Sequence, residues 1–148
     1  MTKLILREGN LFHTEAPAIG HGINNKGVMG AGIALQFKTL YPEMYAVYQS
    51  ACRAGQVRGG GSYGWDQENI TVYNICSQEE PGANASYDFL IEGVTRTIQQ
   101  MQWKSQKLLA LPRIGSGIGG LNEQLVERIL GFLAEQTEVD IELWTYKA

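Results

Sequence analysis

Two glycine-rich segments are the parts of this chain best suited to hold a ligand. Gly27–Gly32 (GVMGAG) separates an expected strand from an expected helix, and Arg113–Gly120 (RIGSGIGG) has the same setting later in the chain. Glycine lets the backbone approach a ligand closely, and the first N–H groups of a helix have no partner within it, so they attract anions. Two such loops at one site could bind both phosphates of a diphosphate.

Other glycine-loop motifs fit the sequence poorly. Neither segment contains the GxxxxGK[ST] pattern of a P-loop, and neither is a complete GxGxxG fingerprint. Gly115, Gly117 and Gly119 are spaced too closely for that fingerprint and come late in the chain, which disfavours redox chemistry on a dinucleotide. The alternative interpretation is that the glycines only form tight turns, and the presence of two loops in one setting weakens that alternative.

Among the side chains that could move a proton, His21 is the strongest candidate. An ordinary histidine has a pKa of about 6.5, which suits an acid, a base or a hydrogen-bond donor at neutral pH. The alternative for His21 is a structural role beside neighbouring backbone, and His13 is expected at the surface. Cys76 has apolar flanks and no nearby histidine, so a catalytic thiolate is disfavoured. Cys52 and Cys76 form neither a metal-binding pattern nor a disulfide framework, and we expect no metal and no cofactor.

The charge of the chain restricts its partners. The 148 residues include 12 Lys and Arg against 15 Asp and Glu, a formal net charge of -3, so no basic field is available for a polyphosphate backbone. We therefore expect no extended nucleic-acid surface, while a small anion held by backbone N–H groups is compatible with an acidic protein. Without a signal-like start or a long apolar run, the sequence predicts a cytoplasmic protein, in the host cytoplasm if the source is viral, and no membrane contact.

The elements expected around the glycine loops alternate along the chain. Strands are expected at 3–7, 16–23, 69–76, 108–112 and 138–146, and helices at 33–41, 42–54, 86–101 and 121–135. Such alternation predicts an α/β fold, with residues 1–148 as a single domain and helices on both faces of one sheet. Ligands bind such sheets beyond the carboxyl ends of the strands, where both glycine loops are expected. Trp65, Trp103 and Trp144 are expected to pack in the core or between helices and sheet.

Three motifs in register make a family resemblance specific. Gly9–Phe12 (GNLF) follows the first strand, His21–Asn24 (HGIN) precedes Val28–Ala34 (VMGAGIA), and Pro112–Gly117 (PRIGSG) includes the start of the second glycine loop. With these motifs the chain resembles the macrodomain family over essentially its whole length. It is most similar to the branch of terminal ADP-ribose glycohydrolases, DNA ADP-ribosyl glycohydrolase antitoxins and ADP-ribose 1''-phosphate phosphatases. The resemblance implies a three-layer α-β-α macrodomain with a central mixed sheet, and ADP-ribose or an ADP-ribosylated substrate as the partner.

The resemblance also implies which residues contact ADP-ribose. Asn10 stands where most relatives carry an aspartate that accepts a hydrogen bond from the adenine amino group, and Leu11 offers a backbone N–H. Asn24 matches the asparagine that touches the hydroxyls of the distal ribose, and Ile118 would pack near that sugar. The implied ligand-binding set comprises Asn10, Leu11, Asn24, Val28, Met29, Gly30, Ala31, Gly32, Arg113, Gly115, Ser116, Gly117, Ile118, Gly119 and Gly120.

Two departures from the family pattern concern catalysis. The glycohydrolases use a lysine just after the third expected strand, where this chain has Ser77 and Gln78, and the human-type enzyme uses an aspartate where this chain has Gly119. A covalent mechanism that depends on the lysine is therefore not expected. We expect a hydrolase in which a positioned water removes a phosphate, an acyl group or an ADP-ribosyl linkage at the anomeric carbon.

The implied catalytic residues are His21, Asn24 and Ser116, which would surround this water near the distal ribose. Two alternatives to a hydrolase stay open. One is a reader module that binds ADP-ribose without turnover, which the missing lysine and aspartate favour. The other is an RNA- or partner-binding α/β domain whose glycine loops are only turns, which the acidity disfavours. The oligomeric state also stays open, and a monomer is compatible with the sequence.

Overall fold

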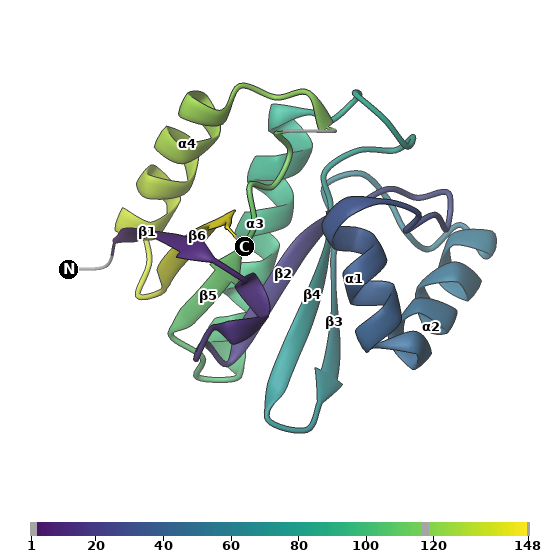
Figure 1. Ribbon diagram of the computed structural model, residues 1–148, viewed down its shortest axis with the longest axis horizontal. Helices are drawn as coiled ribbons and strands as arrows, with labels where there is room; N and C mark the ends of the chain where they lie inside the picture. The colour runs from purple at the N-terminus through teal and green to yellow at the C-terminus, as the bar shows by residue number, and fades with distance from the viewer. Residues whose placement is uncertain (1–2, 117–118, 148) are drawn as a thin grey trace.

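A central sheet organises the computed structural model of the protein, which describes residues 3–116 and 119–147. The strands are β1 (Leu4–Gly9), β2 (Ala18–Ile23), β3 (Ser62–Gln67), β4 (Ile70–Cys76), β5 (Leu108–Leu111) and β6 (Asp140–Tyr146). The helices are α1 (Gly32–Leu40), α2 (Pro42–Arg53), α3 (Tyr87–Trp103), α4 (Glu123–Glu135) and the short 3-10 helix η1 (Leu11–His13). The order of strands across the sheet is β1-β6-β5-β2-β4-β3 (Figure 1), and the predicted alternation of strands and helices is confirmed.

The sheet is mixed, as expected. β1, β6, β5, β2 and β4 pair in parallel, whereas β3 pairs antiparallel with β4 at one edge. Glu68, with a φ of 49°, and Asn69 form the two-residue turn that joins β3 to β4. The sequence pattern did not predict β3, because Gly64 and Asp66 are of types depleted in strands and interrupt the favourable Tyr63 and Trp65. Residues 62–67 form a strand because they pair with β4, and not because of their own sequence preference.

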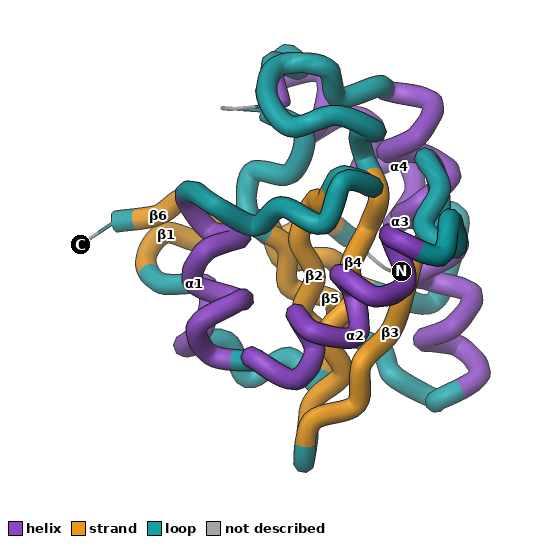
Figure 2. The backbone as a smooth tube through the Cα atoms, turned by 90° about the vertical axis from the view of Figure 1, so that its right-hand side faces the viewer, coloured by secondary structure: helices purple, strands orange, loops and turns teal. Residues whose placement is uncertain are grey.

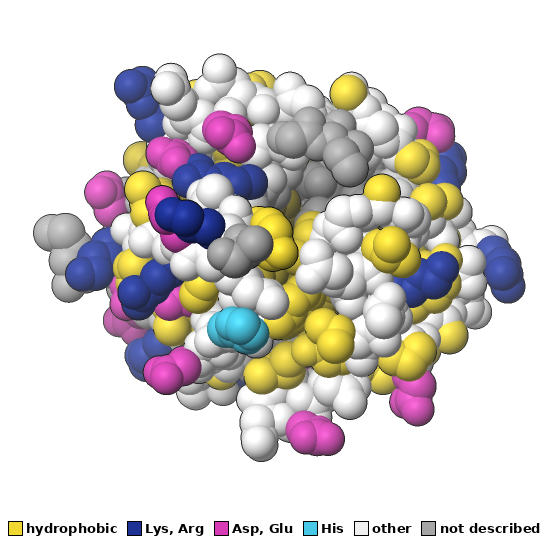
Figure 3. Space-filling model, in the orientation of Figure 1, with side chains coloured by type: hydrophobic (Ala, Val, Ile, Leu, Met, Phe, Trp, Pro, Cys, Tyr) yellow, Lys and Arg dark blue, Asp and Glu magenta, His cyan; other side chains and the backbone are white. Residues whose placement is uncertain are grey.

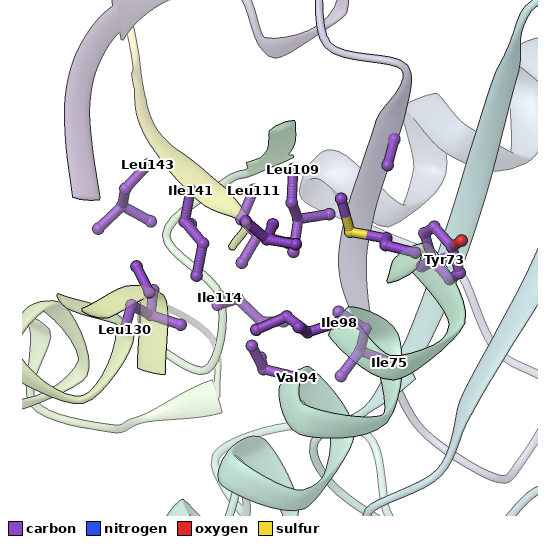
Figure 4. Close-up of a cluster of buried hydrophobic side chains, with 14 of the residues drawn as sticks. Tyr73, Ile75, Val94, Ile98, Leu109, Leu111, Ile114, Leu130, Ile141 and Leu143 are labelled. Carbon is purple, nitrogen blue, oxygen red and sulfur yellow. The ribbon is translucent and has the colours of Figure 1, made fainter. Parts of the chain in front are cut away.

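Helices cover both faces of the sheet and give the three expected layers (Figures 1 and 2). α3 and α4 pack on one face, and α1 and α2 pack on the other. Successive side chains of a strand point to opposite faces, so Tyr73 and Ile75 of β4 enter one core while Val72 and Cys76 enter the other. Figure 4 shows the first core, where Leu130 of α4 lies near side chains of the sheet. Since both faces are covered, the central strands leave only their ends free for a site.

The three tryptophans do not behave alike. Trp65 and Trp144 pack against the core under α1 and α2, as expected. Trp103, the last residue of α3, is 91% exposed, so the expectation that it fills the core is wrong. The buried face of α3 ends at Met101, which leaves the Trp103 ring beyond the core. Of the helices in the described residues, none is long and apolar enough to span a membrane.

Two helix glycines differ in what surrounds them, which gives a stability prediction. A Cβ on Gly93 of α3 would lie 2.5 Å from Ile75 Cγ2, whereas a Cβ on Gly131 of α4 would meet Leu4 atoms only at 4.0 Å. We expect Gly131→Ala to raise the free energy of unfolding by up to about 1 kcal/mol through helix propensity. Gly93→Ala should lower it by about 1–3 kcal/mol, because overpacking outweighs the same gain. Urea denaturation measures both changes, and stabilisation by Gly93→Ala would contradict the close contact of α3 with β4.

Candidate functional site

A cavity lies where the parallel strands end, and Figure 3 shows a hollow with hydrophobic side chains near the middle of the face it presents. Its wall consists of residues that follow β1, β2, β4 and β5, together with the end of β6. This location follows from the fold, because the carboxyl ends of parallel strands meet at one edge. Its volume of about 870 Å³ lies within the range of about 300–1,000 Å³ typical of small-molecule sites. Among the described residues, the wall contains Arg113 but no Asp, Glu, His or Lys side chain.

Side-chain hydrogen bonds hold the first glycine loop and the residues just before it in shape. Asn24 Oδ1 accepts from the backbone N–H groups of Lys26 at 2.9 Å and Val28 at 3.5 Å, and Asn24 Nδ2 donates to Val28 O at 2.9 Å. From α2, the Tyr48 hydroxyl donates to Asn24 O at 2.8 Å, and the Tyr45 hydroxyl donates to Gly27 O at 3.0 Å. Asn24 lines the cavity, and the second hydrogen on its Nδ2 gives the side chain a donor for a ligand.

The first glycine loop ends on an open helix N-terminus. Ala31 is the N-cap residue of α1 and makes no side-chain cap bond, and the first turn of α1 has no acidic residue. Gly32 has a φ of 58°, a left-handed conformation that glycine adopts without steric cost. Ala31, Gly32, Ile33 and Ala34 all line the cavity, so N–H groups with partial positive charge border it. This arrangement suits an anion.

The second glycine loop is built differently. Gly115, with a φ of 76°, lines the cavity together with Ser116 and Gly119. However, α4 begins only at Glu123, and the side chain of Asn122 caps its first turn. The second loop therefore presents backbone to the cavity but no open helix N-terminus, contrary to the expectation that both loops share one setting.

Two of the expected ligand contacts, Met29 and Gly120, are not part of the cavity wall. Gly117 and Ile118 lie outside the described residues. Gly120 is not part of the wall, and a Cβ there would lie 3.2 Å from Ala83 Cβ, so it packs against the loop that precedes α3. Met29 is buried in the core under α1 and α2, also behind the wall. The remaining expected contacts all line the cavity: Asn10, Leu11, Asn24, Val28, Gly30, Ala31, Gly32, Arg113, Gly115, Ser116 and Gly119.

Arg113 lines the cavity, but protein groups bind its guanidinium. Nη1 forms an ion pair with Glu127 of α4, and Nε donates to Thr145 Oγ1 at 2.9 Å. Its backbone oxygen accepts from the Ser116 hydroxyl at 2.9 Å, which fixes the start of the second glycine loop. Arg113 therefore braces the strand ends against α4, and Glu127 offsets its charge.

Asn10 marks the end of the cavity nearest β1, on the far side of the sheet order from β4. Its Oδ1 accepts from Phe12 N at 2.9 Å and caps η1, which uses one lone pair of that oxygen. The other lone pair is available to a donor such as an amino group. Leu11, Trp144 and Tyr146 line the same part of the cavity, so this end can receive a flat, largely apolar ring.

His21 lies in the core and not in the cavity wall. Its ring is fully buried and stacks on Phe37 of α1 with the ring centroids 3.9 Å apart. Nε2 donates to Asn74 Oδ1 at 2.6 Å, since Asn74 Nδ2 donates to Met44 Sδ at 3.1 Å. Nδ1 then carries no proton and has no partner among the described residues, and burial lowers the pKa of His21 to about 4. This position gives no support to the expected contact with a distal ribose, and we assign His21 a structural role.

A third loop completes the wall; from the sequence, its Ser77 and Gln78 mark only the place of a missing lysine and are not expected ligand contacts. Ser77, Gln78, Pro81 and Gly82 follow β4 and line the cavity. The strand pattern alone could have indicated them, because every parallel strand delivers its following loop to the same edge. Cys76, just before this loop, is buried, and burial raises the pKa of its thiol to about 12, so it stays protonated at neutral pH. No group of three or more His, Cys, Asp or Glu within the described residues could hold a metal ion.

The sequence matches the family model of the Macro domain over residues 21–130, which include both glycine loops. The DNA ADP-ribosyl glycohydrolase of Thermus aquaticus is 30% identical over 143 residues, which cover 94% of this chain and 39% of that protein. The chain thus spans 39% of the length of this curated relative. The family match agrees with the resemblance that the three motifs indicate.

Solved structures share the fold. The macrodomain of Mycobacterium tuberculosis DarG gives a TM-score of 0.90 at 30% identity and covers 97% of this chain and 98% of its own. DarTG of Thermosipho africanus, solved in complex with ADP-ribose, gives a TM-score of 0.88 at 22% identity over 98% of this chain and 42% of its own. The second similarity shows the fold alone. Together they confirm the predicted three-layer architecture.

The buried histidine predicts how stability depends on pH. The folded pKa of His21, about 4, lies below the ordinary value of 6.5, so the unfolded chain takes up the proton first as the pH falls. Stability from neutral His21 is fully present above about pH 6.5 and is lost between about pH 6.5 and 4, in total about 3 kcal/mol. His21→Gln keeps a donor for Asn74 and does not titrate, so it should flatten this part of the profile. Denaturant unfolding over this pH range measures the slope, and an equal slope in the variant would contradict a buried neutral ring.

Proposed function

The chain belongs to the Macro domain family, and from this membership we propose that it binds ADP-ribose in the cavity and hydrolyses a bond at the anomeric carbon of the distal ribose. One observation carries the proposal: an open helix N-terminus and both glycine loops border a single cavity of about 870 Å³. Such a cavity offers backbone N–H donors to an anion and an apolar end to a nucleoside. A relative of the same fold, DarTG of Thermosipho africanus, has been solved with ADP-ribose.

We place the adenine, the diphosphate and the distal ribose one after another along the cavity, each beside wall residues that suit it. The adenine lies near Asn10 and Leu11, at the apolar end. The diphosphate lies over the N-terminus of α1, beside Ala31. The distal ribose then reaches the polar side chains of Asn24, which precedes the first glycine loop, and Ser116 of the second.

Backbone dipoles, more than cations, neutralise the phosphates in this proposal. Arg113 pairs with Glu127, and Lys26, just before the first glycine loop, pairs with Glu80 at 3.3 Å. A diphosphate held by N–H groups is compatible with the formal net charge of -3. The site would therefore recognise the ADP-ribose group itself, whether protein, DNA or a small group carries it.

The proposed hydrolysis uses a positioned water. By the family resemblance, Ser77 and Gln78 follow β4 where glycohydrolases carry a lysine, and Gly119 takes the place of an aspartate. Cys76 stays protonated and His21 lies in the core, so the described wall has no activated protein nucleophile. Water attacks the anomeric carbon, and a phosphate, a carboxylate or the group that carried the ADP-ribose departs.

A second candidate function is recognition of ADP-ribose without turnover. The observation that favours it is the lack of Asp, Glu, His and Lys side chains in the described part of the cavity wall. Both functions need the same binding site, so turnover alone separates them.

Calorimetry and turnover assays together test the proposed function. Titration with free ADP-ribose should produce binding heat, and none at millimolar ligand would contradict both candidate functions. Turnover is then measured on ADP-ribosylated DNA, ADP-ribosylated protein, ADP-ribose 1''-phosphate and an acyl ester of ADP-ribose. The DNA substrate comes first, because the curated relative of Thermus aquaticus is a DNA ADP-ribosyl glycohydrolase. Binding without turnover on all four would leave the reader module.

An acidic residue at the N-cap of α1 should raise the stability of the protein and lower its affinity for ADP-ribose. Ala31 already has the extended conformation of an N-cap residue, with φ of -151° and ψ of 161°, so an aspartate there can accept from the first turn. We expect Ala31→Asp to raise the free energy of unfolding by about 1 kcal/mol. The same carboxylate occupies the N–H groups and repels the diphosphate, so ADP-ribose affinity should fall by about ten-fold or more.

Asn122→Asp provides the matched control for this variant. It adds the same charge at the N-cap of α4, and Asn122 does not line the cavity. Calorimetry should find its ADP-ribose affinity within about two-fold of wild type, because exposed charges are well screened in salt. Unchanged affinity in Ala31→Asp would place the phosphates away from α1.

A further inference from the structure

Gln78 lies where the three loops of the cavity meet. It follows β4, and its half-buried side chain is part of the cavity wall. On one side, Asn25 N donates to Glu79 O at 3.2 Å, which ties the segment just before the first glycine loop to the residue after Gln78. On the other side, a Cβ on Gly119 would lie 3.2 Å from Gln78 Oε1, and Ala85 N donates to Gly119 O at 3.1 Å. Gln78 thus lies beside the second glycine loop and next to a residue bonded to the segment that leads into the first.

The two hydrogens of the Gln78 amide fix its orientation. Nε2 donates to Glu80 O at 2.6 Å and to Gly82 O at 2.8 Å, which uses both hydrogens. The reversed amide would set its oxygen against two carbonyl oxygens, which is repulsive. Oε1 therefore points away from the carbonyls of its own loop. No donor to Oε1 is found among the described residues, and Gln78 lines the cavity, so Oε1 can accept a hydrogen bond from a ligand or a water there.

We propose that Gln78 Oε1 accepts a hydrogen bond from the water that attacks the anomeric carbon and so sets the direction of attack. This inference rests on the proposed hydrolase function and names a positioning residue for it. Oε1 lies beside Gly119 of the second glycine loop, and the same loop contributes Ser116, which receives the distal ribose in our placement. A glutamine amide can orient an attacking water without taking its proton, as the glutamine of small GTPases does.

The hydrolytic step balances without a protein base. The water oxygen forms a bond to the anomeric carbon, and the bond from that carbon to the leaving group breaks with its electron pair on the leaving group. The proton that the water loses passes to the leaving group or to solvent. Gln78 changes neither its charge nor its covalent bonds, so its contribution is one of orientation and belongs in kcat.

The alternative role of Gln78 is to hold the loop together through Nε2. Asn84 does the same for this loop, because its Nδ2 donates to Pro81 O at 3.0 Å and its Oδ1 accepts from Glu80 N at 3.1 Å. Asn84 is not part of the cavity wall. Its truncation therefore loosens the same loop and leaves the acceptors of the cavity in place.

Steady-state kinetics of Gln78→Met and Asn84→Ala in the whole chain test the inference. Methionine keeps the length of the side chain and removes the oxygen acceptor. With the substrate that the wild type hydrolyses fastest, we expect Gln78→Met to lower kcat by about ten- to a hundred-fold. Its KM, and its Kd for ADP-ribose by calorimetry, should stay within about three-fold of wild type. Asn84→Ala should keep kcat within about three-fold.

Three outcomes would overturn this role for Gln78: an unchanged kcat in Gln78→Met, an equal loss of kcat in both variants, or a loss confined to KM and Kd. Circular dichroism verifies folding, and Gln78→Leu, which also lacks the acceptor, replaces the methionine variant if that one does not fold. A wild-type protein that binds ADP-ribose and hydrolyses none of the four substrates would overturn the hydrolase function, and the role of Gln78 with it. Failure of the inference alone and failure of the function are therefore distinguishable.

Discussion

A backbone that binds phosphate must keep its N–H groups free and still hold them in place, and this constraint explains most of the polar contacts near the cavity. The side chains of Asn24, Tyr45 and Tyr48 bind backbone atoms of residues 24–28, so the connection between β2 and α1 is held by the protein itself. Ala31 leaves the first turn of α1 uncapped. A site fixed in advance loses little entropy when a ligand binds, which is what an acidic chain without a cationic clamp needs.

The loops can converge because two residues near the carboxyl end of β2, Gly20 and Gly22, have no side chain. A Cβ on Gly22 would lie 2.7 Å from Ser77 Oγ, and a Cβ on Gly20 would lie 2.9 Å from a side-chain atom of Leu111. Glycines at these two positions let the neighbouring strands β4 and β5, and the loop after β4, pack directly onto β2. His21 between them points to the opposite face, where Phe37 and Asn74 bury it. Successive residues of a strand face opposite sides of the sheet, so the face that carries the two glycines cannot also carry His21, and the histidine does not reach the cavity.

The sequence pattern predicted helices on both faces of a sheet and both glycine loops, because hydrophobic periodicity and the position of loops after parallel strands are local properties. The mixed sheet was implied by the family resemblance. It did not predict the burial of His21, since the partner Asn74 lies 53 positions away on another strand. The N-cap of α4 could be predicted from the sequence, because Asn122 directly precedes Glu123. The hydrogen bonds from Gln78 to Glu80 O and Gly82 O could not, because they depend on how that loop folds. Local pattern thus located the cavity, and contacts between distant segments determined which side chains reach it.

A wall with no Asp, Glu, His or Lys among its described residues also restricts the chemistry that the proposed hydrolase can perform. General acid–base catalysis contributes about 10²–10⁴-fold where a titratable group is available, and the described wall offers no Asp, Glu, His or Lys for this purpose. Orientation by Gln78 and Asn24 and the dipole of α1 act on the water and the diphosphate, and none of them supplies a proton to a poor leaving group. The proposed mechanism therefore favours substrates whose leaving group departs as a stabilised anion, such as a phosphate or a carboxylate. A linkage that must be protonated before it breaks would need that proton from solvent or from the substrate itself.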